Sequence, residues 1–159
     1  MRVQPGAGYL RSQSRAKLIQ ETLREVRERF EARIVHYSIQ GNHLHLIAEA
    51  EDAHALARAM QGLATRLARR LNRLNHRTGG VFADRYHARA LATPREVAHA
   101  VRYVLNNYRH HAHEPLPRTW RDPLATRTDM PLSAPTVWLL RIGWRLRFAK
   151  ATRPDLEDP

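Results

Sequence analysis

Apolar residues recur every three or four positions in the first part of the chain, from about Ser14 to Phe30. Charged residues of the same stretch fall mostly on the opposite side of a helical projection. This spacing is typical of an amphipathic helix that buries one face. The pattern therefore predicts a helix whose buried face consists of Leu18, Ile19, Leu23, Val26 and Phe30.

The pattern then changes to alternation. Residues Ile34–Gln40 and His43–Glu49 alternate and include β-branched and aromatic side chains, which favour strands. Gly41 and Asn42, which separate the two segments, are typical of a tight turn. The two segments predict an antiparallel β-hairpin.

Two more helices follow the hairpin. An apolar stripe with helical spacing runs from Leu56 to Leu74, and Thr78–Gly80 ends it with turn-forming residues. Thr93–Glu96 has the sequence of a capping box, with Pro94 at the first helical position. This signal predicts a third helix that continues to about His111. Between the two helices, Val81–Leu91 is short and mixed, and we expect a strand there.

The C-terminal third is less regular. Five prolines mark residues 114–136 as a linker. Alternation in Val137–Phe148 favours a strand, whereas Ser133 and Pro135 are typical of a helix start; we expect a short docking element and favour the helix. The organisation predicted is thus a domain over residues 1–113, a proline-rich linker over 114–136, and a docking element with a frayed polar tail over 137–159.

Composition narrows the class of protein. A chain of 159 residues with 43% hydrophobic residues is expected to form one domain with a core. It has no Cys, which excludes disulfides, thiolate metal sites and cysteine nucleophiles. It also has no stretch of about 18 apolar residues and no secretory leader pattern. We therefore expect a soluble cytoplasmic protein without a membrane partner.

The charge balance indicates a polyanionic partner. The formal net charge is +12, and 25 of the 27 basic residues are Arg; a codon bias of the genome is the alternative explanation for this preference. Residues 53–90 contain eight Arg and a single acidic residue, Asp84. Such a surface favours nucleic acid, because it neutralises phosphates and releases counterions. An anionic membrane surface is the weaker alternative.

His43 and His45 are the sharpest pair of candidate ligands. Residues two apart in a strand project to the same face, so both imidazoles point away from the core that Leu44 and Leu46 enter. Two neutral imidazoles side by side suit a divalent metal. A solvated strand face is the alternative interpretation, since the chain has 10 His.

The third helix offers a tyrosine and an amide. Val97, Val101 and Tyr108 lie on its apolar stripe, whereas Tyr103 lies off it with Asn107 one turn further on. Tyr108 is therefore expected in the core. An ordinary half-buried tyrosine and a solvated asparagine are the alternatives for Tyr103 and Asn107.

Taken in order, these segments resemble a known family. Gly41–Ile47, with its His-Leu-His, resembles the His-hydrophobe-His motif of the HUH endonuclease superfamily. Arg102–Asn107 resembles the tyrosine helix of its single-tyrosine transposases, and Gly80–Tyr86 is similar to a segment of the REP-associated tyrosine transposases. Trp138–Arg145 resembles endings of the same group more weakly. The chain is thus identified as resembling an insertion-sequence-type transposase.

The resemblance implies a mechanism. Tyr103 would attack a DNA phosphate and form a 5′-phosphotyrosine link, while His43, His45 and Asn107 would bind Mg²⁺ or Mn²⁺. The activity implied is a metal-dependent single-stranded DNA endonuclease and strand transferase. A phenol is a weak nucleophile at neutral pH, because its ordinary pKa is about 10. A nearby cation therefore suits this chemistry.

The resemblance also gives the arginines candidate roles on single-stranded or hairpin DNA. Three of them lie near the motifs and could grip the strand around the cleavage site: Arg85, Arg89 and Arg102. Three lie on the second helix and could hold a hairpin stem: Arg66, Arg70 and Arg73. A solvated basic helix face is the alternative. Some relatives exchange the tyrosine helix in dimers and others resemble monomers; we favour a monomer.

The family fold is α+β, a ferredoxin-like antiparallel sheet with helices packed on it. Its first strand precedes the first helix, and here only Met1–Gln4 could supply it, so we expect that strand to be truncated. A shortened sheet favours a second hypothesis, a catalytically inactive or domesticated protein that only binds hairpin DNA. An RNA-binding protein of similar build is a weaker alternative, because no stacking-platform motif is present.

Overall fold

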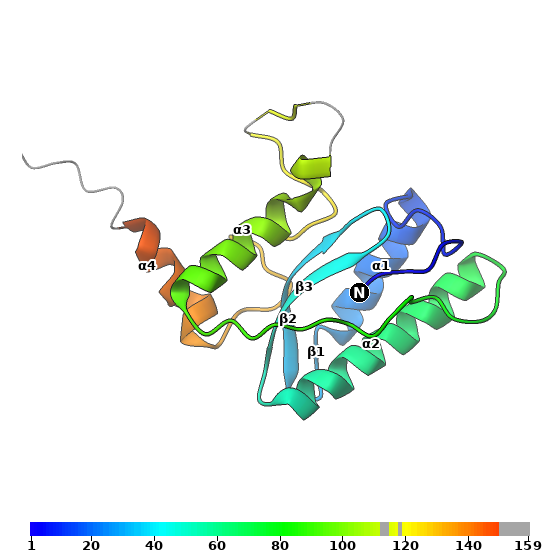
Figure 1. The fold of residues 1–159 in the computed structure, drawn as a ribbon, viewed down its shortest axis with the longest axis horizontal. Coiled ribbons are helices and arrows are strands. Elements are labelled where there is room, and N and C mark those ends of the chain that lie inside the picture. The colour runs from blue at the N-terminus through cyan, green and yellow to red at the C-terminus, as the bar shows by residue number, and fades with distance from the viewer. Residues whose placement is uncertain (112–114, 118, 150–159) are drawn as a thin grey trace, which may run out of the picture.

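The computed structural model describes residues 1–111, 115–117 and 119–149, and it has the predicted α+β class (Figure 1). Its sheet is antiparallel with the order β1-β2-β3. The strands are β1 (Glu28–Arg29), β2 (Ala32–Ile39) and β3 (Leu44–Ala50). The long pair β2–β3 is the predicted hairpin, because Ile39 lies opposite Leu44 across the turn.

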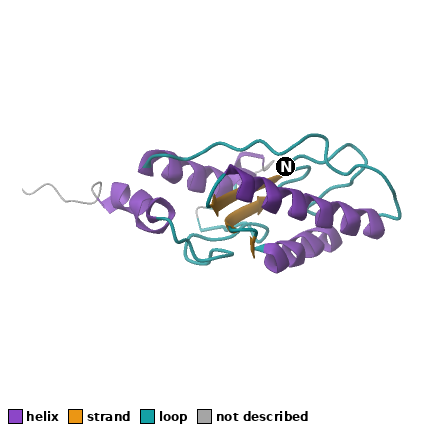
Figure 2. Ribbon diagram, turned by 90° about the horizontal axis from the view of Figure 1, so that it is seen from below, coloured by secondary structure: helices purple, strands orange, loops and turns teal. Residues whose placement is uncertain are grey.

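Helices pack on both faces of this sheet (Figures 1 and 2). On one face lie α1 (Gln13–Val26) and α2 (Ala53–Leu74), which share a core with Tyr37, Ile39 and Leu44. On the other face lies α3 (Pro94–His111), which packs with Val35 and Ile47. The C-terminal element, a π-helical turn η1 (Leu139–Gly143) followed by α4 (Trp144–Ala149), packs beside α3. The helix favoured from sequence is therefore confirmed.

The first helix is shorter than its apolar pattern predicts. It ends at Val26, and the chain then turns through Phe30 and Glu31, whose φ angles are 56° and 58°. These left-handed residues form the turn between β1 and β2, so Phe30 lies beyond the helix and is exposed. No helix in the described part of the chain is long and apolar enough to cross a bilayer.

A β-bulge in β2 sets which side chains face α3. The ladder pairs Ile34 with Ala48 and then His36 with Ile47, so one extra residue, Val35, is accommodated on β2. Successive residues on either side of a bulge can point the same way. Val35 and His36 consequently both lie on the α3 side, where Ile47 also packs.

The N-terminal segment fills the position beside the histidine strand. The Met1 ammonium donates to the Leu44 carbonyl at 2.9 Å, and the Leu44 amide donates back to Met1 at 2.8 Å. On the other side of this segment, Gln4 donates to the carbonyl of Val81 at 2.8 Å. The first strand is thus reduced to isolated bridges, as its shortness predicts, but it still pairs the start of β3.

The expected strand over Val81–Leu91 is wrong. Only Phe82 bridges to a neighbour, Val3, and the chain beyond it is irregular up to α3. We call residues 83–92 the strap; it belongs to the long loop from the end of α2 to the start of α3 (Figure 2). The capping box predicted at Thr93–Glu96 is confirmed, and it fixes the C-terminal end of the strap. The Glu96 carboxylate accepts from the amides of Ala92 and Thr93 at 2.9 and 3.1 Å, and these bonds fix a helix start instead of a ladder.

The segment predicted as a linker packs along the free side of β2. Ile39 donates to the Leu124 carbonyl at 2.9 Å, and Thr126 donates to the Tyr37 carbonyl at 3.0 Å. The domain boundaries proposed from sequence stay a prediction. The frayed tail expected at the C-terminus falls on residues 150–159, outside the described residues.

Candidate active site

His43 and His45 stand together at the start of β3, on the α3 side of the sheet. Their Nε2 atoms lie 2.9 Å apart, and their ring centroids are 4.6 Å apart with planes nearly perpendicular. The Nδ1 atom of His43 lies 2.8 Å from the Asn42 Oδ1 atom. This turn residue therefore orients the first imidazole, and the two Nε2 atoms face one another at hydrogen-bonding distance.

Tyr103 reaches the same point from α3. Its ring lies against that of His45, with centroids 5.2 Å apart and an interplanar angle of 77°. Tyr103 is 52% exposed, so a large substrate can approach it. By contrast, Tyr108 is half-buried beneath the Arg11 guanidinium, which lies 3.7 Å from its ring centroid. The two tyrosines of this helix therefore differ in exposure, but the expected core position of Tyr108 is wrong, because it belongs to neither core cluster.

Asn107 lies one turn beyond Tyr103 and is buried, with only 1% of its surface exposed. Its Oδ1 atom is a buried acceptor without a hydrogen-bond partner among the described residues. Leaving such an atom unsatisfied costs about 1–3 kcal/mol. The alternative of a solvated asparagine is wrong, and an unsatisfied acceptor at this place requires an explanation.

The metal predicted from sequence can be tested against these donors. Two imidazole nitrogens and one amide oxygen form a mixed nitrogen and oxygen donor set that suits a divalent ion such as Mn²⁺. Within the described part of the chain, no group of three or more His, Asp or Glu residues could hold a metal. The unsatisfied Oδ1 atom of Asn107, on the same helix as Tyr103, is the acceptor that would complete such a set.

Two polar residues beneath the histidines were not identified from sequence. Ser38 lies directly opposite His45 in the ladder, and both Ser38 and Gln40 are buried. The Gln40 side-chain amide donates to the Ser38 hydroxyl at 2.7 Å, and the Gln40 backbone donates to the His43 carbonyl at 2.8 Å. They brace the turn that carries the imidazoles. The signal available was the polar alternation at positions 36, 38 and 40.

His36 lies on the same face of the sheet, opposite Ile47 in the ladder. It is buried, and its Nδ1 atom lies 3.1 Å from the Thr126 hydroxyl. Burial, with a smaller contribution from the nearby Arg145 charge, lowers the pKa of His36 to about 4. It is therefore neutral at physiological pH and acts as a packing residue.

The arginines of α2 are on the other face of the sheet from Tyr103. Arg70 binds the Glu25 carboxylate at 2.7 and 2.9 Å and the Thr22 hydroxyl at 2.9 Å, so it joins α2 to α1. Arg66 is partly buried and Arg73 is exposed. DNA that contacts both this helix and the tyrosine must therefore pass around the sheet.

The arginines nearer the tyrosine are also dispersed. Arg89 of the strap forms an ion pair with Glu96 at 2.7 Å, and Arg85 and Arg102 are exposed. The structure thus brings His43 and His45 together with Tyr103 of α3, the helix that also carries Asn107. The six candidate arginines are not gathered around them.

Comparison with known proteins agrees with this order of motifs. A family model described as "Transposase IS200 like" matches residues 7–107, which is more than half of the chain. The matched span includes the β2–β3 hairpin, the strap and α3 as far as Asn107. No curated protein and no solved structure gives a significant match to the chain.

Proposed function

The chain belongs to the IS200-like transposase family, and from this membership we propose that it cuts and rejoins single-stranded DNA through Tyr103. Membership itself supports a role in DNA transposition. The finer proposal is a metal-dependent endonuclease and strand transferase that acts on single-stranded or hairpin DNA. It works through a 5′-phosphotyrosine intermediate.

One observation carries the proposal: the Tyr103 ring lies against His45, whose Nε2 atom faces that of His43 at 2.9 Å. A nucleophile and two ligand-type nitrogens from separate elements thus share one exposed place. The buried oxygen of Asn107, one turn along the same helix, supports a metal at this place because it has no other described partner.

Each residue has a role that its position supports. His43, His45 and Asn107 would hold Mg²⁺ or Mn²⁺, which would polarise the scissile phosphate and offset the charge that develops on it. Tyr103 is held by α3 and is exposed on its surface. Ser38 and Gln40 keep the histidine turn in place from below.

The covalent step balances without a further reactant. The Tyr103 Oη atom forms a bond to phosphorus, and the bond between phosphorus and the 3′ oxygen breaks. The phenolic proton is lost from the tyrosine, and one proton is gained by the departing 3′ oxygen. The products are a 5′-phosphotyrosine link and a free 3′-hydroxyl, and attack by such a hydroxyl on the link reverses the step on another DNA end.

The test uses the full chain, Mn²⁺, and a 3′-labelled DNA hairpin with randomised single-stranded flanks. We expect a labelled covalent adduct that survives denaturing electrophoresis, that requires the metal, and that Tyr103→Phe abolishes. Tyr108→Phe, on the same helix but turned toward Arg11, is the matched control and keeps the adduct. An adduct that persists in Tyr103→Phe overturns the assignment, and hairpin binding without any adduct indicates the inactive DNA-binding protein instead.

A further inference from the structure

The contact between His43 and Asn42 determines which nitrogen of the His43 ring carries the hydrogen. The His43 Nδ1 atom lies 2.8 Å from the Asn42 Oδ1 atom. An amide oxygen accepts hydrogen bonds and cannot donate them, so the Nδ1 atom carries the hydrogen and donates it. A neutral imidazole has a single N–H group. The Nε2 atom of His43 therefore bears a lone pair.

One hydrogen lies between the two imidazoles. The Nε2 atoms of His43 and His45 are 2.9 Å apart, which is a hydrogen-bonding distance. Since the Nε2 atom of His43 is the acceptor, the Nε2 atom of His45 is the donor. The two neutral rings are therefore not equivalent. His43 already has the tautomer that a ligand at Nε2 needs, whereas His45 must first give up its Nε2 hydrogen.

The turn that carries Asn42 is fixed by its neighbours. The Val3 amide donates to the Asn42 carbonyl at 2.9 Å, and the Leu10 amide donates to the Gly41 carbonyl at 2.8 Å. The Tyr9 ring lies so close to Gly41 that an added Cβ atom would be 2.9 Å from the Tyr9 Cε2 atom. These contacts hold the backbone from which the Asn42 side chain reaches His43.

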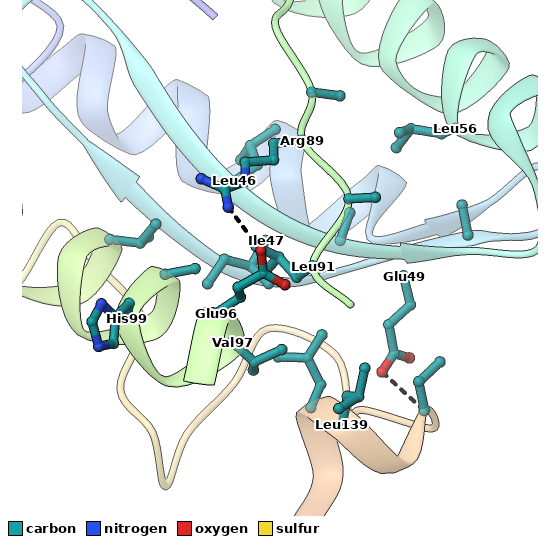
Figure 3. Close-up of a pocket in the computed structure, with 18 of the residues that line it drawn as sticks. Leu46, Ile47, Glu49, Leu56, Arg89, Leu91, Glu96, Val97, His99 and Leu139 are labelled. Carbon is teal, nitrogen blue, oxygen red and sulfur yellow. Dashed lines mark hydrogen bonds and ion pairs between the residues drawn. The ribbon is translucent and has the colours of Figure 1, made fainter. Parts of the chain in front are cut away.

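The strand beyond the turn is also held in place. Ile47 of β3 packs with Val97 of α3 in one buried cluster, next to the ion pair that Arg89 forms with Glu96 at 2.7 Å (Figure 3). Because both ends of the histidine segment are anchored, the freedom left to each imidazole is rotation of its side chain and the choice of the nitrogen that bears hydrogen. A hydrogen bond to Nδ1 restricts both for His43.

We propose that Asn42 is a positioning residue, which holds His43 in the tautomer whose Nε2 atom can bind a divalent ion. The inference rests on the proposed function, because that function assigns His43 and His45 to a metal. Ligating histidines commonly donate their second ring nitrogen to an oxygen acceptor, and loss of that acceptor lowers metal affinity about 10–100-fold. The competing interpretation is a surface contact that leaves the ring unaffected, since Asn42 is exposed.

Two substitutions separate these interpretations. Asn42→Ala removes the acceptor, whereas Asn42→Asp retains an oxygen acceptor at the same place. Asn42 is exposed and its φ angle lies outside the left-handed region, so both variants are expected to fold. Asn106→Ala, at an exposed site of α3, is the matched control for loss of an asparagine side chain.

The experiment records long-range ¹H–¹⁵N spectra of the imidazoles in the metal-free full chain at about pH 8.5, where a histidine with the ordinary pKa of about 6.5 is neutral. We expect the wild type, Asn42→Asp and Asn106→Ala to carry the His43 hydrogen on Nδ1 and the His45 hydrogen on Nε2. In Asn42→Ala the His43 hydrogen should move mainly to Nε2. A His43 hydrogen on Nε2 in the wild type, or an unchanged tautomer in Asn42→Ala, overturns the proposal.

The affinity for Mn²⁺, measured by electron paramagnetic resonance of the free ion, is the second readout. We expect it to fall at least tenfold in Asn42→Ala and not to fall in Asn42→Asp or Asn106→Ala. Equal affinities of the wild type and Asn42→Ala overturn the proposal even where the tautomer changes.

Neither readout requires DNA cleavage. An adduct at Tyr103 without a tautomer change in Asn42→Ala leaves the proposed function intact and overturns the role of Asn42. The expected tautomers and affinities without any adduct support the role of Asn42 and reject the covalent chemistry at Tyr103.

Discussion

The guanidinium of Arg11 and the carboxylate of Asp122 form a bidentate ion pair, with N–O distances of 2.8 and 2.9 Å, although 111 positions separate them. Only 8% and 1% of the two side chains are exposed. Arg11 also donates to the Ile39 carbonyl at 2.6 Å and lies over the Tyr108 ring. One side chain thus joins the turn before α1, the end of β2, α3 and the segment that follows α3.

Arg11→Leu is expected to lower the free energy of unfolding by about 3–5 kcal/mol, because it leaves the buried Asp122 carboxylate without its partner. Urea unfolding followed by circular dichroism measures the change. Arg127→Leu, which removes an exposed ion pair to Asp129, is the control and should have little effect. Equal losses in the two variants would show that the Arg11 pair has no special structural role.

Asn107→Leu should remove activity and raise stability together. The substitution replaces a buried acceptor without a described partner by an apolar group of similar size, which relieves a cost of about 1–3 kcal/mol. We expect a higher unfolding midpoint in urea without metal, and loss of the Mn²⁺-dependent adduct. Asn106→Leu, at an exposed site of the same helix, should keep the adduct. A destabilised Asn107→Leu protein would mean that the Oδ1 atom is already satisfied.

Glu49 holds the C-terminal element onto the sheet. Its carboxylate accepts from the amides of Thr136 and Val137 at 2.9 Å each and from the Thr136 hydroxyl at 2.8 Å. Glu49→Ala should cost about 2–3 kcal/mol, since hydrogen bonds to charged groups are the stronger ones. Hydrogen exchange should accelerate in residues 137–149 and not in α2. Glu51→Ala, at an exposed neighbour, serves as the comparison and should not change the exchange of either region.

His36 predicts a loss of stability on acidification. Burial lowers its pKa to about 4 in the folded state, whereas an unfolded His has a pKa of about 6.5. The unfolded state therefore binds the proton first, and stability falls as the pH drops from about 6.5 to about 4, by about 3 kcal/mol in total. The melting temperature plotted against pH across this range should have a shallower slope in His36→Gln than in the wild type. His87→Gln, at an exposed site of the strap, should retain the wild-type slope.

The elements that are specified by residues close together in the sequence were predicted correctly. The apolar stripe of α2 and the capping box of α3 were read correctly because each element contains its own start or its own periodicity. The expected strand over Val81–Leu91 failed for the opposite reason. Whether a short mixed segment becomes a strand depends on a partner edge, and here only Phe82 reaches one. No pattern within the segment contains that information.

Part of the candidate site could be predicted from the sequence. Alternation alone placed His43 and His45 on one face, and helical phase placed Tyr103 off the core stripe. The burial of Asn107 could not be predicted from the sequence. Helical phase gives the angular distance of a residue from the apolar stripe, but it does not show what covers the rest of the helix surface. Here the polar residues Ser38 and Gln40 form a second buried surface of the sheet, which no apolar pattern marks.

The bulge at Val35 has a consequence for how this chain tolerates changes in length. The extra residue shifts the alternation of β2, and only with that shift do Tyr37 and Ile39 point into the core while Ser38 lies opposite His45. Deleting Val35 itself would make Ile34 and His36 consecutive opposite Ala48 and Ile47, so the ladder would become regular and keep its register. Deleting a residue within Tyr37–Ile39 would instead turn the end of the strand over. Position 35 is therefore the place in this strand where the loss of one residue is expected to be tolerated best.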